Sequence, residues 1–191
     1  MDQKLIMSNE HVVNYNYIIN KILSVIVSNE IDTMLTKAFQ CAEDENYSDA
    51  LKLYDLILKK EPYNINALID KGATLQNMGR LNLAIRSYDK ALTISPNNLD
   101  ALLNKGATLH SDQKYEKAIG CYDEALMIDK KCAMALAYKG LSLGEMGKLQ
   151  DAIKYFKKAL SIDNNYDLAS ISKKIAQELL QSIKENKIKT Q

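Results

Sequence analysis

The sequence predicts an all-α fold, and three observations lead to that prediction. Glycine and proline together supply only 9 of the 191 residues, too few for the tight turns of a β-sandwich or barrel. Apolar residues recur at spacings of three and four along most of the chain, as on one face of an amphipathic helix. The segments 71–75, 105–109 and 139–143 read KGATL, KGATL and KGLSL, and the interval between them is constant. We therefore expect a solenoid of similar helical hairpins.

Four units fit this period without insertions, and they cover residues 31–64, 65–98, 99–132 and 133–166. Each unit splits into two helical halves of about 14 residues, a length that is marginal alone and is stabilised by packing on neighbouring helices. In two units the halves are separated by Gly79 or Gly147, and two of the unit boundaries carry Pro62 or Pro96. Both residue types mark helix ends.

Small residues recur inside the helices. Gly72 lies mid-helix, where glycine costs roughly 1 kcal/mol relative to alanine, and Gly106 and Gly140 repeat it in the next units. The second half of every unit carries an alanine and, one helical turn later, an aromatic ring: Ala50 and Tyr54, Ala84 and Tyr88, Ala118 and Tyr122, Ala152 and Phe156. We expect the small residues to let the two helices of a unit approach closely, with the ring filling the space between them.

This pattern resembles the tetratricopeptide repeat (TPR) family, whose unit is a 34-residue helix–turn–helix. The resemblance spans four consecutive repeats, residues 31–166, and rests on these residues and their counterparts in the other units: Leu68, Gly72, Leu75, Ala84, Tyr88, Ala91 and Pro96. It implies a right-handed α-α superhelix whose concave face is lined by the first helix of each unit. In this family that face usually holds a peptide or a segment of a partner protein.

The family's concave-face positions, carried onto this sequence, form a groove that is apolar in the middle and mildly acidic along one side. The candidate groove residues are Leu35, Thr36, Phe39, Ile69, Asp70, Ala73, Leu103, Asn104, Ala107, Ala137, Tyr138 and Leu141. Only Asn104 fits the Lys/Asn/Arg set with which some family members clamp a C-terminal carboxylate, so that role is disfavoured. The groove suits a segment with apolar anchors and one or two basic residues, and Leu103→Lys is expected to abolish its capture without changing the melting temperature.

The two ends of the chain depart from the repeat. Residues 167–185 predict a C-terminal capping helix with an apolar stripe of Leu168, Ile171, Ile175, Leu179 and Ile183, followed by a frayed tail over 186–191. Residues 1–30 predict an N-terminal helical extension, because apolar residues from 12 to 26 form a stripe at helical spacing. Two interpretations of that extension stay open: it covers the first repeat, or it mediates dimerisation.

Nothing in the sequence points to catalysis, a metal site or a cofactor. Phosphate-binding glycine motifs and H-E-x-x-H are absent, and the three cysteines have no C-x-x-C spacing. His110 falls near the expected groove, either as a ligand contact or, as we favour, as an incidental surface residue. Lys37, Lys71, Lys105 and Lys139 recur once per unit, either as a basic track or, as we favour, facing the edge of a neighbouring repeat. Net charge is near zero, so neither nucleic acid nor a membrane is expected as a partner, and cysteine usage favours the cytoplasm.

The leading hypothesis is therefore a non-catalytic protein-binding scaffold that captures a partner peptide or segment in its concave groove. The alternative is a homo-oligomeric, chaperone-like TPR protein that dimerises through its N-terminal helix.

Overall fold

The computed structural model describes residues 21, 23, 25 and 30–189, and the regular secondary structure of these residues is entirely helical. The chain divides into two compact units, residues 1–62 and 63–191. Unit 1 contains a helix over residues 30–43 and the helix α2 (Tyr47–Lys60). The sequence-predicted N-terminal helix lies outside the described residues, apart from positions 21, 23, 25 and 30. Within the described residues, no helix combines the length and apolar character needed to cross a membrane.

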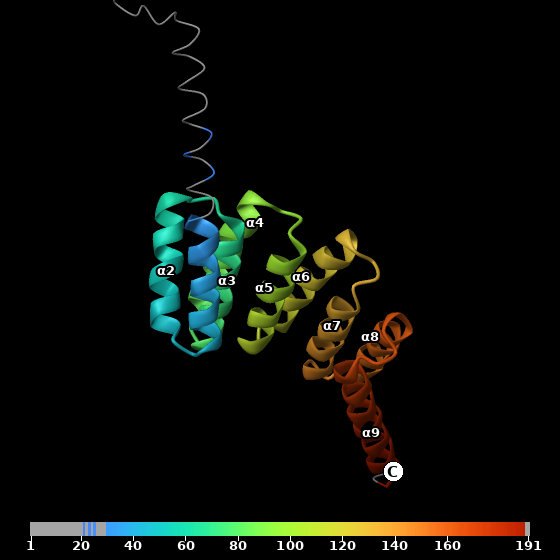
Figure 1. Cartoon of the computed structure of the whole chain (residues 1–191). Helices are drawn as coiled ribbons and strands as arrows, with labels where there is room; N and C mark the ends of the chain where they lie inside the picture. The colour runs from blue at the N-terminus through green and yellow to red at the C-terminus, as the bar shows by residue number, and fades with distance from the viewer. Residues whose placement is uncertain (1–20, 22, 24, 26–29, 190–191) are drawn as a thin grey trace, which may run out of the picture. The chain divides into compact units, whose positions relative to one another are not determined.

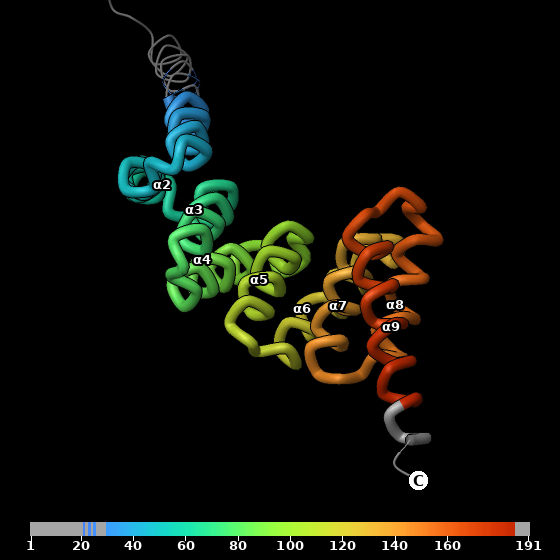
Figure 2. Tube along the Cα trace, turned by 90° about the horizontal axis from the view of Figure 1, so that it is seen from below, coloured from blue at the N-terminus to red at the C-terminus, as the bar shows by residue number. Residues whose placement is uncertain are grey.

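Unit 2 is a run of helical hairpins at the predicted spacing (Figures 1 and 2). Its helices are α3 (Ile65–Asn77), α4 (Leu81–Ile94), α5 (Leu99–Ser111), α6 (Tyr115–Ile128), α7 (Ala133–Glu145), α8 (Leu149–Ile162) and α9 (Asp167–Lys189). Each helix packs against the next one along the chain, and the first helices of successive repeats, α3, α5, α7 and α9, also contact one another. The prediction of an all-α repeat solenoid is confirmed.

A glycine–aromatic contact holds each hairpin of unit 2 together. A Cβ atom built on Gly72 would lie 2.6 Å from Cε1 of Tyr88, closer than real Cβ contacts come. Gly106 meets the ring of Tyr122 at 2.5 Å, and Gly140 meets the ring of Phe156 at 2.6 Å. Because these rings are fully buried, a Cβ atom at any of these three glycines would force the ring or its helix to shift. In unit 1 the corresponding residues, Ala38 and Tyr54, are both fully buried.

The turn between the two helices of a repeat contains one residue with positive φ. Gly79 (φ 71°) and Gly147 (φ 74°) adopt this left-handed conformation, for which glycine carries no steric penalty. Glu45 (φ 59°) and Gln113 (φ 58°) adopt the same conformation in the other two hairpins. A residue with a Cβ atom is strained there, so two of the four turns store a small amount of unfavourable energy.

The first helices begin with a side-chain cap. Oδ1 of Asn64 accepts a hydrogen bond from the backbone N–H of Ala67 at 2.9 Å, and Asn98 caps α5 in the same way at 2.8 Å. In α7 the cap is Cys132, whose Sγ lies 3.4 Å from the backbone nitrogen of Ala135. Its place in the repeat makes this cysteine a weak substitute for the asparagine cap.

Helix α9 packs on α7 and α8 through Ala169, Ala176 and the partly buried Leu180, and of the apolar stripe that the sequence suggested only Leu168 is half-buried. Ala169 and Ala176 are buried, whereas Ile171, Ile175, Leu179 and Ile183 are exposed. At the positions one repeat after Leu136, Gly140 and Leu143, which pack inside the preceding hairpin, α9 carries Ser170, Lys174 and Gln177. Polar residues at these positions do not offer the apolar face on which a hairpin partner packs in the preceding repeats. The helix ends at Lys189 and so extends into the predicted tail.

Candidate functional site

The recurring lysines tie adjacent repeats together. Nζ of Lys105, on α5, lies 2.7 Å from Oδ1 of Asp89, on α4 of the preceding repeat. Lys139, on α7, pairs with Asp123, on α6, in the same way. Burial lowers the pKa of Lys105, but the hydrogen bond and charge of Asp89 outweigh it, so this pKa lies above its usual value. The interpretation that these lysines face a neighbouring repeat is confirmed for Lys105 and Lys139.

Polar side chains also join the first helices of successive repeats. The hydroxyl of Thr108, on α5, donates to Oε1 of Gln76, on α3, at 2.6 Å, and Tyr88 Oη donates to the same oxygen at 3.4 Å. One repeat later, Nδ1 of His110 lies 2.9 Å from Oγ of Ser142. Burial lowers the pKa of His110, and the nearby charge of Glu145 opposes this only in part. His110 is therefore a bridge between repeats and not an incidental surface residue.

These bridges define which face of each first helix is covered by the next repeat. Gln76 follows Ile69 by two helical turns, so both lie on the side of α3 that faces α5. Ile69 and Leu103 are accordingly only 8% exposed and Ala137 is fully buried, so these three candidate groove residues are not available to a partner. Leu103 belongs to the hydrophobic core, and Leu103→Lys would therefore destabilise the repeat itself.

The remaining candidate groove residues of unit 2 are partly exposed. They are Asp70 and Ala73 on α3, Asn104 and Ala107 on α5, and Tyr138 and Leu141 on α7. We call this surface the first-helix face. Three exposed residues extend this face by one helical turn: Asn77, Ser111 and Glu145. Each lies four residues after a candidate groove residue, a spacing from which the sequence could have predicted them. In unit 1, Thr36 and Phe39 are exposed and Leu35 is half-buried.

Asp70 is the distinctive charged group of the first-helix face. Its side chain is half-buried, and this burial raises the pKa of the carboxyl group above its ordinary value. Asp70 forms no ion pair within the described part of the chain, whereas Asp89 and Asp123 on the second helices each hold a lysine. A partly desolvated carboxylate without a counter-ion is a favourable position for a basic group of a ligand.

An apolar pocket adjoins the first-helix face at Leu141. It encloses about 430 Å³ between α7, α8 and α9, and Glu145 lies among its lining residues. Its apolar walls come from side chains of all three helices: Leu141, Leu149, Phe156, Ile175, Leu179 and Ile183. The first-helix face therefore changes along the unit, from small residues and Asp70 at α3 to large aliphatic side chains at α7 and α9.

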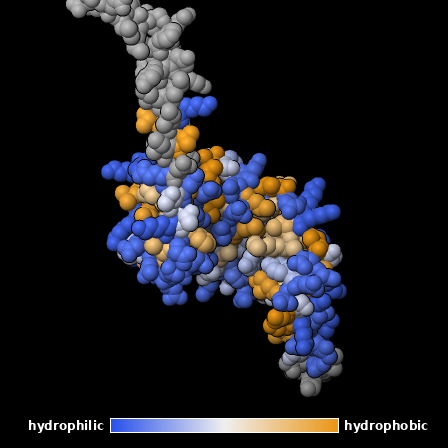
Figure 3. Space-filling model, viewed as in Figure 1, coloured by the Kyte–Doolittle hydropathy of each residue, from blue (hydrophilic) through white to orange (hydrophobic). Residues whose placement is uncertain are grey.

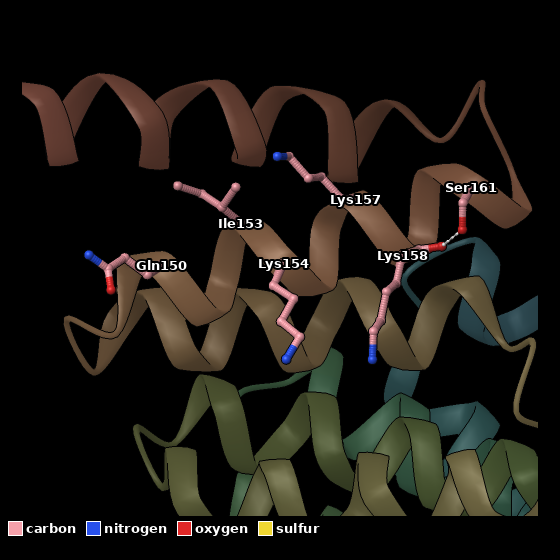
Figure 4. A pocket seen from close by; sticks show the side chains of 6 residues that line it. All are labelled: Gln150, Ile153, Lys154, Lys157, Lys158 and Ser161. Carbon is pink, nitrogen blue, oxygen red and sulfur yellow. Dashed lines mark hydrogen bonds between the residues drawn. The ribbon is translucent and has the colours of Figure 1, made fainter.

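A second hollow, of about 420 Å³, lies on α8 and is basic (Figure 4). Figure 4 shows Ile153 and Lys157 pointing to one side of the helix and Lys154 and Lys158 to the other, while Ser161 donates to the backbone oxygen of Lys158 at 2.7 Å. The three lysines are exposed, and no carboxylate within the described residues forms an ion pair with them. They supply positive charge without a cavity shaped for a particular anion.

Comparisons with known proteins agree with this architecture. Two family models described as "Tetratricopeptide repeat" match residues 99–132 and 133–166, and one described as "TPR repeat" matches residues 72–113. A search of curated proteins gives no match.

Among solved structures, the chain is similar to a crystal structure of MamA protein, with a TM-score of 0.68 and 24% identity over 78% of this chain and 82% of that one. A second crystal structure of MamA gives a TM-score of 0.67 and 25% identity over 73% of this chain and 81% of that one. A further MamA structure, MamA MSR-1, gives 0.64 and 18% identity over 82% of this chain and 90% of that one. At this level of identity, the similarity supports a shared fold only.

Proposed function

Because the chain is a tetratricopeptide repeat protein, we propose that it is a non-catalytic scaffold that holds a segment of a partner protein on its first-helix face. Repeat solenoids bind partners on extended surfaces made of equivalent positions in successive repeats, and this chain presents such a surface on α3, α5 and α7. The partner we propose carries apolar side chains and one or two basic residues.

The observation that supports this proposal most directly is the burial of Asp70 without a counter-ion within the described residues. Its carboxylate is half-buried without a counter-ion in the described part of the chain, and its pKa is raised by burial. A lysine or arginine from a partner would restore the interactions that burial removes from the ionised form. An anionic segment would meet repulsion at the same place, so the charge of Asp70 selects the sign of the ligand.

The neighbouring side chains support apolar anchoring. Ala73 and Ala107 are half-exposed and small, which leaves room over α3 and α5 for large side chains of a bound segment. Leu141 and the pocket beside it offer aliphatic surface at the other end of the first-helix face. Affinity should therefore come mainly from burial of apolar surface, with Asp70 setting charge preference and orientation.

Selection from a random displayed peptide library on the immobilised full chain tests this function without knowledge of the partner. The wild type should enrich peptides that combine large apolar residues with lysine or arginine. Asp70→Lys should remove the preference for basic residues, whereas Asp151→Lys, the same charge change at an exposed position of α8, should leave it unchanged. Enrichment of acidic peptides by the wild type, or an equal effect of both substitutions, would contradict the proposal.

The alternative, a chaperone-like dimer formed through residues 12–26, rests on one described feature of that segment. The side chains of Leu23 and Val25 are both exposed. Light scattering of the full chain beside a chain that begins at Glu30 tests this alternative, because only the full chain should then exceed the monomer mass.

A further inference from the structure

Helix α9 carries a continuous apolar stripe that the described residues leave uncovered. Ile171, Ile175, Leu179 and Ile183 are 60%, 59%, 50% and 41% exposed, respectively. They are spaced by four residues, so one large aliphatic side chain stands on each successive turn of the same side of the helix. Figure 3 shows hydrophobic surface in the region where Figure 1 places α9. Contiguous apolar surface of this kind marks an interaction site.

The rest of the solenoid indicates what kind of neighbour the stripe lacks. Ile171 occupies the repeat position of Ile69, Leu103 and Ala137, which are 8%, 8% and 0% exposed. In each of those three cases the first helix of the next repeat packs alongside. No such helix follows α9 within the described residues, and Ile171 is exposed for that reason. The neighbour missing beside Ile171 is therefore another helix. Ile175 and Leu179 continue the stripe at the repeat positions of Leu141 and Glu145, which the next repeat leaves accessible.

We propose that α9 of a second copy of this chain covers the stripe, and that the two α9 helices pack antiparallel about a twofold axis. A row of residues four apart forms a ridge, and two such ridges interdigitating is the commonest mode of helix packing. The stripe is such a ridge, so an identical helix is complementary to it in shape.

The charges that flank the stripe favour this antiparallel arrangement. Lys174 and Glu178 stand on the outer flank of α9, one turn apart, with Nζ and Oε1 separated by 4.0 Å. Suppose that the twofold axis lies in the interface, perpendicular to α9 and level with the middle of Ile175–Leu179. The flanks that carry Lys174 and Glu178 in the two copies then lie on the same side of the interface and run in opposite directions. Lys174 of each copy then lies near Glu178 of the other, which gives two ion pairs at the rim of the interface. A parallel pair would not bring these opposite charges together.

Sedimentation equilibrium of the full chain over a range of concentrations tests the dimer. The wild type should reach twice the mass of the monomer. Ile175→Asp and Leu179→Asp should each raise the dissociation constant by about 30-fold or more, as expected for a central apolar side chain of an interface. Both residues are exposed, so circular dichroism and thermal melting of the monomer should remain close to those of the wild type.

Met127→Asp is the matched control, because Met127 is an exposed apolar residue on α6, away from α9. It should leave the dissociation constant unchanged. A wild type that stays monomeric at the highest concentration reached, or a control that weakens the dimer as much as Ile175→Asp, overturns the proposal. So does a dimer that survives Ile175→Asp but dissociates on Ile19→Asp, because the N-terminal segment would then form the interface.

A charge exchange tests the antiparallel direction. Lys174→Glu and Glu178→Lys should each weaken the dimer by about threefold to tenfold, the effect expected of exposed ion pairs. The double variant Lys174→Glu/Glu178→Lys should restore the wild-type dissociation constant, because both pairs form again with the charges reversed. Failure of the double variant to recover contradicts the antiparallel arrangement. If Ile175→Asp instead reduces enrichment from the peptide library while the wild type is monomeric, the stripe belongs to the partner-binding surface and the dimer proposal is wrong.

Discussion

The hydroxyl of Thr108 donates a hydrogen bond to Oε1 of Gln76 across 2.6 Å, and this bond links the first helices of two successive repeats. The same oxygen accepts from the hydroxyl of Tyr88, the ring that packs on Gly72 inside the repeat. Gln76 therefore links the packing of α3 on α4 within one repeat to the packing of α3 on α5 of the next repeat. Because nearest-neighbour interfaces supply much of the stability of a solenoid, this side chain couples the two levels of the fold.

Gln76→Ala should lower the free energy of unfolding by about 1–3 kcal/mol, because it leaves the buried hydroxyl of Tyr88 without its acceptor. Urea unfolding followed by circular dichroism measures the effect. Asn77→Ala, at the exposed neighbouring position, is the control and should change stability by less than about 0.5 kcal/mol. Equal effects of the two substitutions would show that the Gln76 bridge contributes nothing of its own.

His110→Gln should stabilise the chain and remove part of its pH dependence. His110 occupies the repeat position of Gln76, and the buried hydroxyl of Tyr122 beside it has no hydrogen-bond partner within the described residues. A glutamine at 110 can accept from Tyr122 and Ser142, as Gln76 does from Tyr88 and Thr108, which is worth about 1 kcal/mol.

The pH dependence follows from the pKa of His110, which burial lowers below its ordinary value. As the pH falls through about 6.5, the histidine of the unfolded chain takes up a proton before the folded one does, so the free energy of unfolding decreases. The difference in stability between His110→Gln and the wild type should therefore widen between pH 7.5 and pH 5.5. A difference that stays constant over this range would contradict the assignment.

Cys132→Asn should raise the free energy of unfolding by about 1 kcal/mol. The thiol of Cys132 caps α7 from 3.4 Å, whereas Asn98 caps α5 from 2.8 Å with a stronger acceptor. Removal of the corresponding cap on α5 by Asn98→Ala should lower the free energy of unfolding by about 1 kcal/mol. Thermal melting of both variants checks the pair, and a loss of stability in Cys132→Asn would mean that burial of the cysteine side chain outweighs its capping role.

Gln113→Gly should also stabilise the chain, by about 0.5–1 kcal/mol. Gln113 has φ 58°, a conformation that costs a residue with a Cβ atom more than the added backbone entropy of glycine in the unfolded state. The opposite change at the equivalent turn, Gly147→Ala, should destabilise by a similar amount, because Gly147 has φ 74° and open space around it. Chemical unfolding compares the two, and effects of the same sign would contradict the strain argument.

Asp70→Asn should raise stability and weaken the proposed binding of basic segments. The raised pKa of Asp70 means that the folded chain disfavours the ionised form, so a neutral amide removes an unfavourable interaction at pH 7. The gain should shrink as the pH falls through the raised pKa of Asp70 in the folded chain, and it should be lost below about pH 4, the ordinary pKa of an aspartate. Asp100→Asn, at an exposed position in the first turn of α5, is the control and should lower stability slightly, because a carboxylate there favours the helix N-terminus.

The sequence predicted most of the fold because its repeat records the packing directly. A glycine on one helix and an aromatic ring on the next identify a helix crossing, and the recurrence of this pair in successive units identifies the stack, since only residues under steric constraint recur so regularly. The candidate site was predicted less well. The family's concave-face positions include Ile69, Leu103 and Ala137, but the next repeat buries these three residues. The repeat pattern alone does not distinguish a residue that faces a partner from one that faces a neighbouring helix.

The sequence by itself therefore determined the helical hairpins, their number in residues 31–166 and the close approach within each, because local periodicity and small side chains depend on contacts close along the chain. Only the tertiary structure decided which residues remain accessible, which polar groups pair and which stay without a partner. Those outcomes depend on distances between helices of different repeats, as for Gln76 with Thr108, and on the absence of a covering helix next to Ile171 in the described chain. Whether a residue is accessible depends on the neighbouring repeats, so it cannot be predicted from the sequence of one repeat alone.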